Sequence, residues 1–254
     1  MMIGFNGGLI GAARDTSAAA SVPGVWTPRE QLKAKRASIW PLNAGEDPYF
    51  ANISLLLRGD GTNGSTTILD ESFSPKTVTA YGNAQISTAQ SKYGGSSIAF
   101  DGSGDYLSVP ASTQFSLSTV DYTIEFWAYW SSTSGIQVIV ECFTGGTGPG
   151  WTLYKNSSNR IDLYSGGAVF SGVTSLSGAS WYYIAVCKSS TNYKLFINGV
   201  QDVSVTYASA NDSSDVLEVG GRGTSFSFNG YIDDLRITKG VARYTSNFTP
   251  PGPL

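Results

Sequence analysis

An alternation with a period of two residues runs through most of this chain and constrains its fold more than any other feature. The clearest instance is the segment 122–130, where every second residue from Tyr122 is apolar and Glu125 falls on the opposite face. Segments of this kind are separated by turn sequences such as Asn198-Gly199. Strands do not alternate with long helical segments, which argues against a parallel sheet. The sequence therefore predicts an all-β, two-sheet antiparallel sandwich.

Short strands at regular spacing fill the chain from residue 53 onward. Charged residues make up 14% of the sequence, well below the roughly 25% of an average domain, and 30 Gly residues supply turns. This composition favours a turn-rich sandwich over a helical bundle. The predicted strands are 53–57, 77–81, 97–100, 122–130, 136–143, 151–155, 160–164, 181–188, 193–198, 203–206, 216–219 and 231–238.

The absence of His removes several kinds of chemistry. With 0 His and 2 Cys, the chain cannot build a Ser-His-Asp or Cys-His centre, nor a four-thiolate zinc site. A net charge of −3 disfavours nucleic acid as a partner, because phosphate binding needs a clustered positive field. No apolar stretch approaches the ~20 residues of a membrane span, and no basic residue precedes an early apolar run. We expect synthesis in a cytoplasm, without membrane insertion.

The carboxylates give no catalytic pair. Glycoside hydrolysis needs two carboxyl groups facing each other across the scissile bond. Glu125 and Glu141 are each a lone carboxylate on a strand, and the adjacent Asp233 and Asp234 are expected to point to opposite faces. The sequence therefore predicts that the protein is not an enzyme. Cys142 and Cys187 are expected to be small buried residues of the sandwich.

Residues 1–50 differ from the remainder, which suggests an N-terminal arm (1–50) and a sandwich domain (51–254). The arm has five basic and four acidic groups, whereas the rest has 11 and 15. Thr27 and Glu30 fit a capped helix start, with Pro28 at the first helical position, and Pro41 ends the helix. A helix of about two turns is unstable alone in water. We expect the arm to pack against a partner or a neighbouring copy.

Five blocks in order along residues 51–251 resemble laminin-G-like domains, which are concanavalin A-like lectin jelly rolls. The blocks are KYGGSSIAFDGSGDYL (92–107), YTIEFW (122–127), WYYIAV (181–186), LFING (195–199), and GYIDDLRITKGVARY (230–244) with FTPP (248–251). The resemblance implies two packed antiparallel sheets, one of them curved, and binding of carbohydrate or protein. Some relatives hydrolyse glycans with a Glu-x-Asp-x-Glu strand, and this sequence has no such triplet.

The arm has a resemblance of its own. The segments PGVWTPREQ (23–31) and KRASIWP (35–41) are similar to a segment that recurs in proteins of tailed phages of cyanobacteria and other marine bacteria, ahead of unrelated C-terminal domains. This implies a virion protein made in the host bacterial cytoplasm: a fibre, tail appendage or capsid decoration. It would bind other virion proteins and further copies of itself. The expected anchor residues are Val25, Trp26, Arg29, Arg36 and Trp40.

The sandwich is then expected to face outward and bind host-surface polysaccharide. Trp151 and Tyr164 are candidate stacking residues for sugar rings. No cofactor is expected except calcium, for which Asp60, Asp101 and Asp105 in Gly-rich loops are the candidate ligands. The alternative for these Asp residues is that they cap turns through nearby backbone amides. Two other functions stay open: a glycan-cleaving depolymerase on the same fold, and a cement protein without a ligand.

Overall fold

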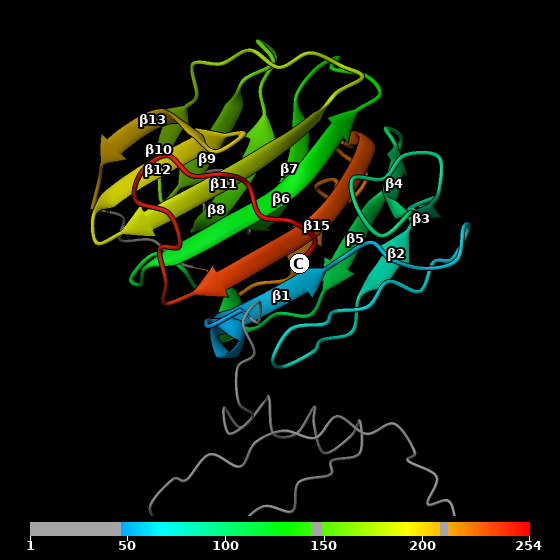
Figure 1. Cartoon of the computed structure of the whole chain (residues 1–254), viewed down its shortest axis with the longest axis horizontal. Coiled ribbons are helices and arrows are strands. Elements are labelled where there is room, and N and C mark those ends of the chain that lie inside the picture. The colour runs from blue at the N-terminus through cyan, green and yellow to red at the C-terminus, as the bar shows by residue number, and fades with distance from the viewer. Residues whose placement is uncertain (1–46, 144–148, 209–212) are drawn as a thin grey trace, which may run out of the picture. The chain divides into compact units, whose positions relative to one another are not determined.

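The computed structural model describes residues 47–143, 149–208 and 213–254, which form two antiparallel β-sheets packed face to face (Figure 1). The eight-stranded sheet consists of β1 (Ile53–Leu57), β3 (Gln85–Ser87), β4 (Ser97–Asp101), β6 (Tyr122–Trp130), β11 (Trp181–Ser189), β12 (Asn192–Ile197), β13 (Val200–Thr206) and β15 (Asn229–Lys239). The seven-stranded sheet consists of β2 (Thr79–Tyr81), β5 (Tyr106–Val109), β7 (Gln137–Phe143), β8 (Gly150–Lys155), β9 (Ile161–Ser165), β10 (Ala168–Ser171) and β14 (Leu217–Val219). Two short 3-10 helices, η1 (Phe50–Asn52) and η2 (Thr113–Phe115), complete the described elements.

The predicted two-sheet antiparallel sandwich is confirmed. Every predicted strand is present with bounds within three residues, whereas β3, β5 and β10 were not predicted. The sandwich forms one compact unit, Asn52–Leu254. The expected anchor residues Val25, Trp26, Arg29, Arg36 and Trp40 lie outside the described residues. No helix among the described residues is long and apolar enough to cross a bilayer.

The long last strand, β15, organises the eight-stranded sheet, because β6 pairs along one side of it and β4 and β1 share the other side. The eight-stranded sheet has the order β13-β12-β11-β6-β15-β4-β3, and β1 pairs with the part of β15 that β4 leaves open. The seven-stranded sheet has the order β10-β9-β8-β7-β14-β5-β2. All strand pairs are antiparallel, so each sheet has one face toward the core and one face outward.

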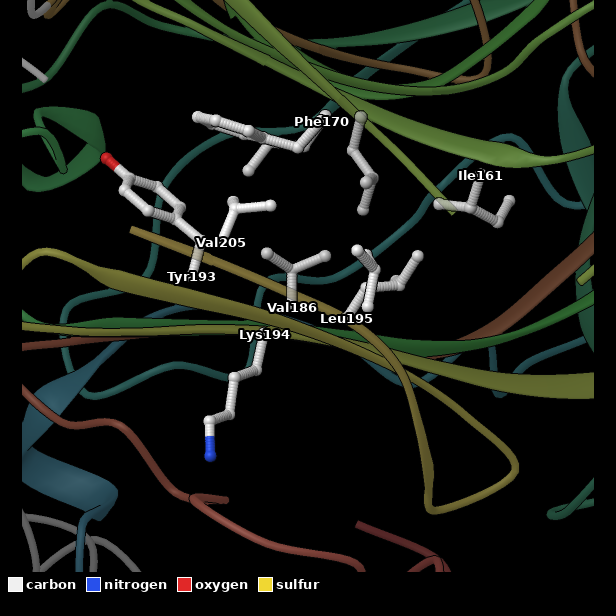
Figure 2. A pocket seen from close by; sticks show the side chains of 10 residues that line it. Ile161, Phe170, Val186, Tyr193, Lys194, Leu195 and Val205 are labelled. Atoms are coloured by element: carbon white, nitrogen blue, oxygen red, sulfur yellow. The ribbon is translucent and has the colours of Figure 1, made fainter. Parts of the chain in front are cut away.

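The core between the sheets is closely packed. Figure 2 shows side chains of β9 and β10 meeting those of β11 to β13 around a cavity of about 10 Å³, too small for a ligand. Ile161 and Phe170 face Val186 across this gap, while Lys194 points away, to the other side of its strand. This cavity is therefore no binding site.

The C-terminal segment 240–254 covers part of the outer face of the eight-stranded sheet. In Figure 1 this segment, drawn in red, crosses in front of β11 and β6. Tyr244 and Phe248 stack on one another and pack on Tyr183 and Phe196. The amide of Phe248 donates to the carbonyl of Gly199 over 2.9 Å, in a turn where a Cβ on that glycine would lie 2.0 Å from the Phe248 carbonyl oxygen. The predicted Asn-Gly turn thus also serves as the docking point of the C-terminal segment.

Under this segment, Glu125 is the centre of a buried network of charged and polar side chains. Its side chain is 0% exposed and accepts a hydrogen bond from Arg236 Nε over 2.7 Å and another from the Tyr183 hydroxyl. Arg243, from the C-terminal segment, lies 3.4 Å from the same carboxylate. Burial is the largest cause that raises the pKa of Tyr183, and the Glu125 carboxylate is the second. The phenol therefore stays protonated and donates its hydrogen bond. Glu125 is therefore a structural residue.

The two cysteines lie on different sheets. Cys142 on β7 faces the core, and Cys187 on β11 lies on the outer face under the C-terminal segment. Both are buried, and neither forms a disulfide. This confirms the expectation of two small buried residues, and burial raises the pKa of Cys187 to about 12.

Candidate functional site

An aromatic groove of about 220 Å³ lies on the outer face of the seven-stranded sheet. Three strands build it, because Glu141, Thr152 and Tyr164 are direct neighbours across β7, β8 and β9 and so share a face. The turn between β14 and β15 closes one side. The groove is lined by Ile136, Val138, Phe143, Thr152, Tyr154, Tyr164, Arg222 and Phe226.

A buried ion pair forms the polar centre of the groove. Arg222 Nε donates to Glu141 Oε1 over 2.9 Å, and Arg222 Nη2 donates to Glu141 Oε2 over 2.7 Å. Thr152 Oγ1 donates to the same Oε2 over 3.0 Å. The Glu141 side chain is 1% exposed, but the Arg222 side chain is 33% exposed and lines the groove. The bidentate pair fixes the orientation of the guanidinium, leaving Nη1 outside these bonds.

Aromatic rings stand around this pair. Arg222 lies over Phe143 at 4.7 Å from the ring centroid and over Phe226 at 5.5 Å. Tyr164 contacts Phe143 edge-on, with ring centroids 5.1 Å apart. Phe226 is 45% exposed and is held by its carbonyl, which accepts a 2.8 Å hydrogen bond from the Val138 amide. The groove thus offers ring faces and edges next to a fixed donor.

Tyr154 adds a protonated hydroxyl to the groove. Burial first, and then the neighbouring Asp162 carboxylate, raise the pKa of Tyr154 to about 12. Asp162 is itself 5% exposed and accepts a 2.9 Å hydrogen bond from the Asn156 amide. A phenol, a hydroxyl of Thr152 and a guanidinium therefore converge within an apolar wall, the usual composition of a small-ligand site.

Glu218 on β14 lies directly opposite Glu141 on β7. The sequence predicted Glu141 to be a lone carboxylate, and this pairing corrects that expectation. Burial raises the pKa of Glu218, whereas both oxygens of Glu141 are engaged by Arg222 and Thr152. In this structure the Glu141 side chain is 1% exposed, and both of its carboxylate oxygens accept hydrogen bonds.

Of the two residues predicted to stack on sugar rings, Tyr164 lies in the groove and Trp151 lies in the core. Tyr164 is partly exposed and lines the groove, as a ligand-binding residue must. Trp151 is 3% exposed and lies in the core, where its Nε1 donates to the carbonyl of Phe115 over 2.9 Å. The expectation for Trp151 is therefore corrected. Neighbouring residues of a strand face opposite sides, and Trp151 is one residue away from Thr152 of the groove.

Two of the three candidate calcium ligands, Asp101 and Asp105, lie next to each other, whereas Asp60 lies apart from them. Asp105 accepts hydrogen bonds from the amides of Asn83 and Asp101 over 2.5 and 2.7 Å, and Asp101 accepts one from the Ser103 amide over 2.7 Å. Asp60 lies against Gly94, near the other end of β4. The turn-capping alternative thus describes Asp101 and Asp105. Within residues 47–143, 149–208 and 213–254, no three carboxylates or thiols are grouped as metal ligands.

Asp233 and Asp234 share a bulge of β15, which corrects the expectation that they lie on opposite faces of a regular strand. The register of β15 against β6 shifts after Asp233, and Asp234 has a φ of 51°. Both carboxyls are buried; Asp233 accepts hydrogen bonds from two backbone amides, those of Lys92 and Tyr93. Burial is the main cause that raises the pKa of Asp233 to about 7 and the pKa of Asp234 to about 6.

These raised pKa values predict how stability depends on pH. The folded protein holds protons that the unfolded chain has already lost, so stability present at low pH is lost as pH rises through 6 to 7. We expect the free energy of unfolding to fall by about 2 kcal/mol between about pH 5 and about pH 8, measured by urea titration. No His titrates in this window.

The matched variant is Asp233→Asn with Asp234→Asn, which keeps an acceptor oxygen at both positions. It should remove most of the decrease in the free energy of unfolding. A wild-type protein that became more stable from about pH 5 to about pH 8 would contradict the assignment.

The two-sheet antiparallel sandwich and a family match together define the class of this protein. Residues 101–243 match the family model Laminin_G_3, described as the concanavalin A-like lectin/glucanases superfamily. The match covers more than half of the chain, and the protein belongs to this family. The laminin-G-like resemblance of the sequence is thus confirmed. No curated protein sequence is significantly similar to the chain.

Solved structures share the fold at low sequence identity. Domain 4 of an extracellular GH43 arabinanase from Geobacillus stearothermophilus, in complex with arabinotriose, is 18% identical with a TM-score of 0.56, and the match covers 74% of this chain and 93% of that one. Botulinum neurotoxin type C, whose cell entry depends on two ganglioside molecules, is 17% identical with a TM-score of 0.56. That match covers 75% of this chain, which spans about half of the neurotoxin chain (48%).

Proposed function

We propose that the protein is a non-catalytic carbohydrate-binding protein that holds glycan in the aromatic groove. The observation that carries this proposal is the combination of Tyr164, Phe143 and Phe226 around the exposed guanidinium of Arg222. The C–H faces of a sugar ring pack against aromatic rings, and its hydroxyls accept from a guanidinium and exchange hydrogen bonds with phenols. The groove has room for a group the size of one sugar ring.

Similar structures support glycan as the ligand class. The arabinanase domain was solved with arabinotriose, and a botulinum neurotoxin DC binding domain, 17% identical with a TM-score of 0.54, was solved with SialylT. These ligands belong to those proteins. For this chain they motivate the choice of polysaccharide as the substance to test.

The alternative of a depolymerase has one observation in its favour, the facing pair Glu141 and Glu218 beside the groove. We propose binding without cleavage because Glu141 has no free oxygen and almost no exposure. Release of oligosaccharide products that stopped on Glu218→Gln would overturn this proposal in favour of an acid-base pair.

We further propose that residues 1–50 attach the protein to a tailed-phage particle, in several copies. The phage-type segments PGVWTPREQ and KRASIWP support this placement. The sandwich would then face the host surface as a fibre, tail appendage or capsid decoration after synthesis in the bacterial cytoplasm. Mass spectrometry of purified particles tests the proposal, and absence of the protein from the particles would refute it.

The groove is tested by Tyr164→Ala. We expect affinity electrophoresis in gels containing linear arabinan, β-glucan or purified host envelope polysaccharide to show retention of the wild type and about tenfold weaker retention of the variant. Tyr49→Ala, at a tyrosine that is 41% exposed and outside the groove, is the matched control. Equal retention of Tyr164→Ala would contradict the groove assignment. Failure of every polysaccharide to retain the wild type would favour the cement protein.

A further inference from the structure

A row of three aromatic residues crosses the outer face of the eight-stranded sheet, on the opposite side of the sandwich from the aromatic groove. Trp181 on β11 lies opposite Tyr129 on β6, and Tyr129 lies opposite Tyr231 on β15. Their ring centroids are 5.6 and 5.8 Å apart. All three side chains are partly exposed. We call these three residues the aromatic row.

The aromatic row leads into a polar hollow. Tyr231 lies opposite Ala99 on β4, and Ala99 lies opposite Gln85 on the edge strand β3. The small side chain of Ala99 leaves a hollow of about 510 Å³ beside Tyr231. The polar residues that line the hollow are Thr66, Asn83, Gln85, Ser87 and Asp101.

The geometry of the row and hollow fits an extended sugar chain. The same register line runs from β11 through β6, β15 and β4 to β3, which are consecutive neighbours in the sheet. Four intervals of about 4.8 Å give a length of roughly 19 Å, about that of an oligosaccharide of four units. Ring faces at one end suit the apolar faces of sugars, and amides and hydroxyls at the other end suit their hydroxyl groups.

Charge restricts the ligand to a neutral one. Among the described residues that line the hollow, Asp101 is the only charged one, and the aromatic row has no charge. A uronate or a sialylated chain would bring a carboxylate next to Asp101, and no cation among the described lining residues of the hollow offsets that repulsion. A lipid chain would leave the amides and hydroxyls of the hollow without partners.

We propose that the aromatic row and the polar hollow form a second carbohydrate-binding surface, specific for a neutral, extended glycan. Because it lies on the other face of the sandwich, one molecule can hold two glycan strands at once. Two sites in one chain raise the retention on a polysaccharide through effective concentration.

The test uses the full chain and isothermal titration with neutral arabinan and β-1,4-glucan oligomers of about two to about six units. We expect two sites per chain, one of which gains affinity up to about four units. Tyr129→Ala should weaken that site at least tenfold and reduce the stoichiometry to one. Gln85→Ala removes a single side-chain amide at the surface. It should weaken binding at the same site severalfold without a change in melting temperature. This second variant controls for misfolding of Tyr129→Ala.

The outcomes separate this proposal from the groove. If Tyr164→Ala has no effect and Tyr129→Ala abolishes binding, the groove assignment fails and the second surface stands. One site that responds only to Tyr164→Ala, no gain with oligomer length, or absence of binding would each overturn the second surface. Polygalacturonate oligomers should bind it at least tenfold more weakly than neutral oligomers of equal length, and equal binding at low salt would also overturn it.

Discussion

Replacing Glu125 by Gln should lower the free energy of unfolding by about 3 to 5 kcal/mol, the largest effect expected for a single substitution in the sandwich. The carboxylate is 0% exposed and compensates Arg236 and Arg243, whose side chains are 7% and 8% exposed. A neutral amide removes the negative charge that both buried guanidinium groups face. Tyr183 would still have an acceptor oxygen, so the loss comes from charge.

Urea unfolding of both proteins followed by tryptophan fluorescence measures this difference. Glu71→Gln is the matched control, since Glu71 and Arg58 form a surface pair at 3.4 Å with side chains 43% and 37% exposed. That change should cost less than about 0.5 kcal/mol. Equal effects of the two substitutions would show that the Glu125 network does not stabilise the sandwich.

Particles assembled with a Trp26→Ala, Trp40→Ala double variant should lack the protein. An interface tryptophan commonly contributes about 2 kcal/mol or more, which is roughly a thirtyfold loss of affinity at each position. Arg29 and Arg36 are the expected polar partners at the rim of this interface. Quantitative mass spectrometry of purified particles measures the incorporation.

Tyr164→Ala, which changes only the groove, should be incorporated normally and serves as the control. Normal incorporation of the double tryptophan variant would refute the anchor. An insoluble or unfolded double variant would favour the alternative in which the arm covers an edge of its own sheet.

The fold was largely predictable because alternation is a local property of the sequence. Strands such as β6 and β11 are long and rich in apolar residues, and their predicted and observed bounds nearly agree. The missed strands are short: β3 has one buried residue, and β10 has none. Such strands exist because a neighbouring strand supplies hydrogen bonds, which a single segment of sequence does not reveal.

The candidate site was predictable only in part. Tyr164 was identified as an aromatic residue on a strand near predicted loops, and the same argument selected Trp151, which is a core residue. Phe143, Arg222 and Phe226 come from segments far apart in the sequence. The one local feature that pointed to a groove residue is Arg222 in the Gly-Gly-Arg-Gly turn at 220–223.

The sequence by itself determined the class of this protein: the alternation specifies strands, the absence of His excludes whole classes of chemistry, and the ordered motifs indicate the family. Tertiary structure alone decided which charges are structural. Glu125 and Glu141 look alike on their strands, yet the first is buried under the C-terminal segment and the second is held by Arg222 beside an open groove. The physical reason is that burial and ion pairing depend on neighbours brought from distant segments, whereas alternation depends only on backbone geometry.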